Sequence, residues 1–120
     1  MKDLGALMLS GKSGRSYTFK IYEFDTMEAL DDAIRDFRQA GLYVFANRNI
    51  KPSDNNWFTI NYIGETDDYS KRDYSSHHKK DEIVSKKSDI WGFCILSGTE
   101  RERKEIEADL IEKYFPSCNG

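Results

Sequence analysis

The sequence contains no long hydrophobic run and only two cysteines, and each scarcity excludes a class of protein. No apolar stretch approaches the roughly 18 residues of a membrane-spanning helix, so no membrane span is expected. The short apolar run near the start is too brief for a signal peptide. Cys94 and Cys118 do not have the spacing of a metal site, and Cys94 lies in an apolar run typical of a core thiol. We therefore expect an intracellular, cytoplasmic protein.

The chain also lacks an excess of basic residues. Its 18 Lys and Arg residues are outnumbered by 21 Asp and Glu residues, and the net charge of −3 counts against nucleic-acid binding. Basic residues nevertheless concentrate between Lys71 and Lys87, together with both histidines of the chain. Two interpretations remain open for this stretch: a solvated polar loop, or a local basic face on an acidic protein.

The length of 120 residues predicts one domain, residues 1–120, with a modest core rich in aromatic side chains. Alternation of apolar and polar residues and short apolar runs predict strands. They are expected at Ala6–Ser10, Ser16–Phe24, Gly41–Ala46, Trp57–Ile63 and Ile90–Leu96. Turn-forming residues fill 47–56. Helices are expected at Thr26–Gln39, Asp67–His78 and Thr99–Tyr114, with Lys79–Asp89 as a basic loop or a continued helix.

The last predicted helix carries two charged residues on its apolar face. Thr99 and Glu102 form a capping-box pattern at its start. At about 100° per residue, Glu107 and Arg103 both fall inside the arc of apolar side chains. A carboxylate there costs free energy unless it is paired or binds a cation. Glu107 is therefore either the partner of Arg103, four residues away, or a ligand for a hard cation such as Mg²⁺.

A second informative stretch, residues 61–72, joins a strand end to a predicted helix. Tyr62 ends the strand, Gly64 breaks its alternation, and Thr66 or Asp67 can cap the helix that follows. That helix would carry Arg72. Packing of a domain does not require an arginine at this place, whereas a phosphate-binding site does.

These separate patterns fit one family in order and spacing. Gly41-Leu42-Tyr43 is followed by Tyr62-Ile63-Gly64, Arg72 stands ten residues after Tyr62, and Glu107 precedes Leu110-Ile111, Pro116 and Asn119. Together they resemble the signature of the GIY-YIG endonuclease superfamily. The resemblance covers residues 41–119 as the family core and leaves residues 1–40 as an N-terminal extension.

The resemblance implies a small α/β domain of the α+β type. Its centre is a three-stranded antiparallel sheet, here 41–46, 57–63 and 90–96, flanked by helices. The N-terminal hairpin and helix could extend this sheet or cover one of its faces.

The resemblance also implies DNA cleavage with one divalent metal ion, Mg²⁺ or Mn²⁺, held by Glu107 and acting as a Lewis acid. Arg72 would neutralise the phosphate charge that builds in the transition state. Tyr43 would act as the base, with Tyr62 as its hydrogen-bonded partner, although their order stays open. A tyrosine with a pKa near 10 is a poor base unless a nearby cation lowers that value.

The histidines depart from the family pattern. Many members have a His or Tyr four residues after the helix arginine, where this chain has Ser76. In a regular helix His77 lies about 140° from Arg72, so a one-residue bulge would be needed to bring it onto the same face. We assign His77 to the catalytic set on that condition. The expected substrate-binding residues are Gly64, Lys71, His78 and Asn119, the last of which would position a phosphate or a loop.

Two functions are consistent with these observations. The first is a metal-dependent endonuclease that hydrolyses DNA phosphodiester bonds. The second is a non-catalytic nucleic-acid-binding or adaptor domain that keeps the fold, which the shifted histidine and the net acidity favour. Family members usually take specificity from an added domain, so we expect structure-selective cutting, or a partner protein or second copy that supplies specificity.

Overall fold

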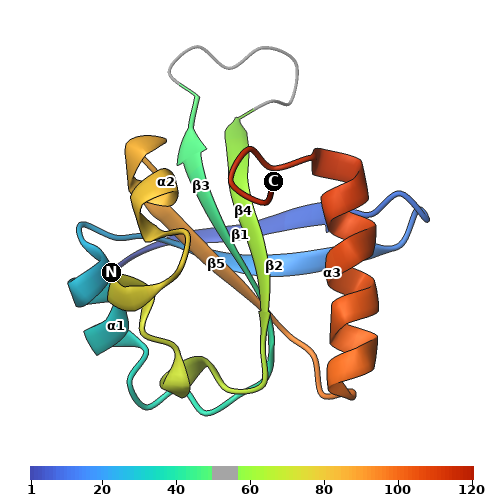
Figure 1. The fold of residues 1–120 in the computed structure, drawn as a ribbon, viewed down its shortest axis with the longest axis horizontal. Coiled ribbons are helices and arrows are strands. Elements are labelled where there is room, and N and C mark those ends of the chain that lie inside the picture. Colours follow the sequence, from blue (N-terminus) through green and yellow to red (C-terminus); the bar gives the residue numbers. More distant parts are fainter. Residues whose placement is uncertain (50–56) are drawn as a thin grey trace.

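The computed structural model describes residues 1–49 and 57–120, so residues 50–56 of the expected turn lie outside the described residues. The fold is α+β, with one five-stranded antiparallel sheet (Figure 1). The strands are β1 (Lys2–Ser10), β2 (Ser16–Glu23), β3 (Gly41–Arg48), β4 (Phe58–Thr66) and β5 (Ile90–Ile95). The helices are α1 (Met27–Ala33), α2 (Lys80–Ser85) and α3 (Glu100–Tyr114), with two 3₁₀ turns, η1 (Tyr69–Lys71) and η2 (Tyr74–Ser76).

The N-terminal hairpin is part of the central sheet. The strand order is β1-β2-β5-β3-β4, and Tyr22 of β2 stands opposite Trp91 of β5. The sheet therefore has five strands instead of the expected three, because the N-terminal extension adds β1 and β2 beside β5. Successive strands rotate strongly, so that β1 and β2 run across β3 and β4 in Figure 1. β3 and β5 lie inside the sheet, while β1 and β4 form its edges.

The two faces of the sheet bury different side chains. Leu42 and Val44 of β3 pack with Leu110 of α3 on one face. Tyr43 and Phe45, their alternating neighbours, pack on the other face with residues from α1, α2 and both 3₁₀ turns. Figure 1 shows α3 alongside β4, on the side opposite α1 and α2. This alternation places the predicted site tyrosine on the face away from α3.

The first helix begins where expected and ends early. The side chain of Thr26 accepts a hydrogen bond from the backbone N–H of Ala29, at 3.1 Å, as an N-cap. The helix ends at Ala33 rather than at Gln39. Beyond it the chain turns and sends Phe37 against Tyr69, with the ring centroids 4.9 Å apart and nearly parallel. This contact with η1 replaces the last helical turn that the spacing predicts.

The predicted helix over 67–78 is wrong, because this segment forms η1 and η2 with extended residues between them. Tyr69 and Tyr74 are both completely buried. Five residues apart, they would point about 140° away from each other on one helix, and separate turns bring both into the same core. Asp31 of α1 accepts hydrogen bonds from the backbone N–H groups of Tyr74 and Ser75, at 2.7 and 3.1 Å. α2 is then a separate short helix.

The last helix agrees closely with its prediction. Thr99 accepts a hydrogen bond from the backbone N–H of Glu102, at 3.1 Å. The helix ends at Tyr114, and Phe115 adopts the left-handed conformation with φ 44° and ψ 57°. None of the helices in the described residues is long and apolar enough to cross a membrane.

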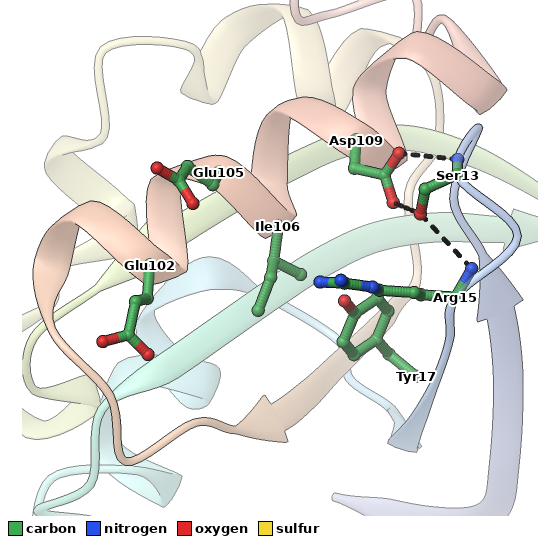
Figure 2. Close-up of a pocket in the computed structure, with 7 residues that line it drawn as sticks. All are labelled: Ser13, Arg15, Tyr17, Glu102, Glu105, Ile106 and Asp109. Carbon is green, nitrogen blue, oxygen red and sulfur yellow. Dashed lines mark hydrogen bonds between the residues drawn. The ribbon is translucent and has the colours of Figure 1, made fainter.

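The turn of the N-terminal hairpin is attached to α3 through Asp109 (Figure 2). Its carboxylate accepts hydrogen bonds from the backbone N–H and the hydroxyl of Ser13, at 2.9 and 2.7 Å. Beside this contact lies an open cavity of about 400 Å³, into which Arg15 and Tyr17 extend under Ile106. A Cβ atom on Gly11 would lie 2.0 Å from an Asp109 oxygen, so a side chain at this position would displace the Asp109 carboxylate.

We predict that Asp109→Asn lowers the melting temperature at pH 7. The hydrogen bonds from Ser13, first from its hydroxyl and then from its N–H, lower the pKa of Asp109 below its ordinary value of 3.8. A carboxyl group with a lowered folded-state pKa stabilises the fold above its unfolded-state pKa, and this stabilisation is lost as the pH falls through the folded-state value. The difference between the variant and the wild type should therefore shrink below about pH 4.

Thermal unfolding followed by circular dichroism over a pH series measures this effect. Asp36→Asn is the matched control, because Asp36 is exposed and its side chain makes no hydrogen bond or ion pair with a described residue. A pH-independent difference for Asp109→Asn would contradict the assignment.

Candidate active site

At the centre of the site, the side chain of Tyr43 crosses the backbone of β4. Tyr43 of β3 stands opposite Gly64 of β4, and its side chain is almost fully buried. A Cβ atom on Gly64 would lie 2.2 Å from Cζ of Tyr43 and 2.4 Å from its hydroxyl oxygen. Only glycine at position 64 lets the ring lie across the backbone of β4.

The hydroxyl of Tyr43 is hydrogen-bonded to Nε2 of His77, at 2.8 Å. The backbone N–H of Lys79 donates to the other ring nitrogen, Nδ1, at 3.0 Å. A neutral imidazole has one donor and one acceptor nitrogen. Because Nδ1 accepts from Lys79, the proton is assigned to Nε2. His77 therefore donates to the oxygen of Tyr43, and the hydroxyl hydrogen of Tyr43 remains for another acceptor.

His77 reaches Tyr43 without the helical bulge that the sequence required. Arg72 and His77 both have extended backbone conformations, with ψ angles of 132° and 138°, and each ends one 3₁₀ turn. The two side chains meet at the Tyr43 ring because each turn redirects the chain. The segment has no regular helical periodicity between Arg72 and His77.

The pKa values of the site are set mainly by burial. Burial, followed by the charges of His78 and Arg72, lowers the pKa of His77 to about 4, so its imidazole is neutral at pH 7. Burial also raises the pKa of Tyr43 and of Tyr62, and the nearby Arg72 offsets only part of that increase. The expected lowering of a tyrosine pKa by this cation is therefore outweighed, and both phenols are protonated.

Tyr62 and Arg72 complete one side of the site. The ring centroid of Tyr62 lies 6.0 Å from that of Tyr43 and 5.0 Å from that of His77. The guanidinium of Arg72 lies 5.6 Å from the Tyr43 ring centroid, and its Nη2 donates to the backbone oxygen of Glu65, at 2.6 Å. A guanidinium has five N–H donors, so this bond fixes its orientation and leaves donors for a ligand.

Glu107 lies on α3 as a half-buried carboxylate. It has no hydrogen-bond or ion-pair partner among the described residues. The alternative pairing with Arg103 does not form, because Arg103 pairs with Glu65 at 3.1 Å, and both side chains of that pair are about nine-tenths buried or more. Burial and then the charge of Glu65 raise the pKa of Glu107, while Lys104 and Arg72 act in the opposite direction.

An unpartnered carboxylate of this kind fits a hard cation. Residues 1–49 and 57–120 contain no group of three or more His, Cys, Asp or Glu side chains arranged to hold a metal ion. The protein therefore offers Glu107 as a single carboxylate, and water and a phosphate would complete the shell of a bound Mg²⁺. This is the donor set that Mg²⁺ takes when it is bound together with a phosphate substrate.

Asn119 holds the edge strand rather than facing open space. Its side-chain oxygen accepts from the backbone N–H of Ile63 and its amide nitrogen donates to the oxygen of the same residue, both at 2.9 Å. The backbone N–H of Cys118 donates to Asn61 oxygen, also at 2.9 Å. Both polar atoms of the Asn119 amide are thus used in positioning β4, and its expected role in positioning a phosphate or a loop stays a prediction.

Two other expected substrate-binding residues lie at the surface. Lys71 and His78 are exposed, and the His78 ring stacks on His77 with centroids 4.5 Å apart. Sequence reasoning missed Asp31, which fixes η2 from 43 residues away. No local pattern marks it, because its role depends entirely on a long-range contact.

Comparison of the chain with protein-family models, with curated proteins and with solved structures gives no match. Its function is therefore argued from the geometry of the site.

We predict that Gly64→Ala displaces the Tyr43 ring and destabilises the fold by about 1–3 kcal/mol, as overpacking of a buried site does. Chemical denaturation followed by tyrosine and tryptophan fluorescence measures the loss. Gly120→Ala is the control, because an added Cβ meets no atom within 4 Å there. Equal stability of the two variants would contradict the close approach of Tyr43.

A second prediction concerns the protonation of His77. Its imidazole should titrate with a pKa of about 4 and carry its proton on Nε2 when neutral. Nitrogen chemical shifts measured by NMR report both properties. The chain has two histidines, so His78→Gln leaves one imidazole and assigns the signals. A pKa near 6.5, the ordinary value, would show that burial does not control this residue.

Proposed function

We propose that the protein is a divalent-metal-dependent endonuclease of the GIY-YIG type that hydrolyses phosphodiester bonds in DNA. One observation carries the proposal. Tyr43, Tyr62, Arg72 and His77 gather on one side of the edge strand β4, and the unpartnered carboxylate of Glu107 lies close enough to influence Tyr62 electrostatically. Packing alone gives no reason for a guanidinium, an imidazole and a free carboxylate to meet at one strand edge.

The fold supports the proposal in a second way. β3, β4 and β5 are neighbouring antiparallel strands, like the three strands that the GIY-YIG resemblance implies, at one side of the five-stranded sheet. The two tripeptides of the signature, residues 41–43 and 62–64, lie on the adjacent strands β3 and β4. Glycine is needed at position 64 because the Tyr43 ring occupies the space of any side chain there. Glycine is also needed at position 41, because a Cβ there would lie 2.4 Å from the hydroxyl of Tyr69.

The proposed mechanism uses each side chain according to its environment. Mg²⁺ or Mn²⁺ bound by Glu107 would supply Lewis-acid stabilisation of the scissile phosphate and the leaving oxygen. Arg72, already oriented by Glu65 oxygen, would donate its remaining N–H groups to the phosphate as charge develops. Glu107 and Arg72 are close enough to influence each other electrostatically, since Arg72 acts to lower the pKa of Glu107.

Tyr43 would orient the attacking water. Its oxygen accepts a hydrogen bond from Nε2–H of His77, so Tyr43 donates its own hydroxyl hydrogen toward Tyr62. For Tyr43 to take a proton from the water, its own hydroxyl proton would first be lost to solvent, and both the Nε2–H of His77 and the charge of Arg72 would stabilise the resulting phenolate. His77 thus acts as a positioning donor for Tyr43.

A non-catalytic nucleic-acid-binding or adaptor domain is the second candidate. Its support is the raised pKa of both Tyr43 and Tyr62, which leaves neither phenol ionised at neutral pH. This candidate predicts salt-sensitive DNA binding with no cleavage under any divalent metal.

We predict that Glu107→Gln abolishes Mg²⁺- or Mn²⁺-dependent nicking of plasmid DNA. Arg72→Lys should reduce the rate by about 10²–10³-fold, because an ammonium keeps the charge but loses the oriented fork. Gel assays of supercoiled plasmid measure nicking, and removal of the metal with EDTA should stop it in the wild type.

Glu105→Gln provides the matched control on the same helix, since Glu105 is exposed and pairs only with Arg101, at 3.4 Å. It should cleave at the wild-type rate. Wild-type cleavage by Glu107→Gln would refute the metal assignment, and absence of cleavage by the wild type with every divalent metal would favour the second candidate.

A further inference from the structure

Phe115, at the end of α3, adopts an unfavourable conformation and gains no burial from it. Its φ of 44° and ψ of 57° lie in the left-handed region, which glycine occupies without steric cost and phenylalanine does not. Its side chain is 79% exposed, more than any other large hydrophobic residue of the described chain. Its backbone N–H closes the helix on Ile111 oxygen at 2.9 Å, which glycine at this position would do equally well.

The fold therefore gives no reason for an aromatic residue at this position. The ring makes no aromatic or cation–π contact within the described residues. A single exposed apolar side chain is ordinary, but one that is also held in a strained backbone conformation indicates a role outside folding.

The position of Phe115 relates it to the candidate active site. It follows Glu107 by eight residues, which is about 12 Å along the helix axis. Figure 1 shows the C-terminal end of α3 and the beginning of β4 at the same end of the molecule. Trp57, 62% exposed, directly precedes β4 there. Two exposed aromatic residues thus lie at one end of the strand that carries Tyr62.

Charges of both signs lie at this end of the molecule, with exposed Glu112 beside Lys113. Lys113 is exposed in the last turn of α3. Lys79 lies beside the C-terminal tail, where its Nζ donates to Gly120 oxygen at 3.0 Å and pairs with Glu82 at 3.3 Å, so Lys113 is the cation considered for a ligand. Projecting aromatic rings bind single-stranded nucleic acid by stacking on its bases, and a nearby cation such as Lys113 attracts its backbone.

We propose that Phe115 stacks on an unpaired base of the substrate, so that the preferred substrate is single-stranded or locally unpaired DNA. This inference rests on the proposed function of the neighbouring site. At about 3.4 Å per stacked nucleotide, the distance of about 12 Å places the stacked base three or four nucleotides from the scissile phosphate. Bases inside a duplex are already stacked on each other, so the ring gains a partner only where the strand is unpaired.

The test compares DNA binding by variants of Phe115 in the Glu107→Gln background, in which the substrate stays intact. Fluorescence anisotropy with a fluorescein-labelled oligonucleotide, single-stranded or annealed to its complement, gives both affinities. Phe115→Gly should weaken single-strand binding by about tenfold and duplex binding much less. It should also raise the melting temperature, because glycine relieves the left-handed conformation.

Two further variants control for shape and for general hydrophobicity. Phe115→Tyr keeps a stacking ring and should keep the single-strand affinity. Met8→Ala removes another exposed apolar side chain, on the opposite edge strand β1, and should leave both affinities unchanged.

The outcomes separate this inference from the proposed function. Unchanged single-strand affinity in Phe115→Gly, in a protein whose wild type cleaves DNA, overturns the inference alone. A tenfold loss of single-strand affinity supports it even when no metal allows cleavage, and in that case only the endonuclease function fails. The inference is also overturned if Phe115→Gly loses as much affinity for duplex as for single-stranded DNA, or if the protein with Phe115 does not bind single-stranded DNA at all.

Discussion

The Tyr43 ring rests on the backbone of β4 at Gly64, and the positions of the other site residues follow from this contact. The ring occupies the space that any side chain at position 64 would need. Its hydroxyl then lies within hydrogen-bonding distance of His77, and its face lies near the guanidinium of Arg72. A glycine on an edge strand thus determines where a phenol, an imidazole and a guanidinium meet.

The segment that supplies Arg72 and His77 is held in place by contacts with other parts of the chain. It contains only short 3₁₀ turns, which have little stability of their own. Burial of Tyr69 and Tyr74 fixes it to the core, and Asp31 of α1 accepts two of its backbone N–H groups. Trp91 adds a hydrogen bond to the hydroxyl of Tyr74, at 3.2 Å. The geometry of the site therefore depends on α1 and on the sheet, although neither contributes a charged group to it.

Features with a local cause were predictable from the sequence. α3 has a capping residue, an apolar stripe and a terminating proline, and its bounds agree with the expectation. The strands of the centre follow from their short apolar runs. The inward position of Arg103 and Glu107 follows from helical periodicity. In the structure Arg103 is buried and Glu107 is half-buried.

Features with a long-range cause were not predictable. Arg103 pairs with Glu65, 38 residues away, and helical spacing alone suggested Glu107 instead. β2 joins the sheet through β5, which a pattern within either strand does not indicate. The predicted helix over 67–78 failed for the same reason, because tertiary burial of two tyrosines and a distant carboxylate determine that backbone. The roles of the site residues rest on a resemblance, whereas their common location follows from the fold.

The C-terminal tail also limits how this molecule can associate. An edge strand normally presents free N–H and C=O groups to which a strand of another chain can bind. Along the outer edge of β4, however, Cys118 occupies the oxygen of Asn61, Asn119 occupies both backbone groups of Ile63, and Arg72 occupies the oxygen of Glu65. Backbone pairing with a second molecule is blocked beside the site, and β1, at the far edge, is where such pairing can extend the sheet. Any assembly formed by strand addition would therefore leave the surface around Tyr43 and Glu107 open to solvent.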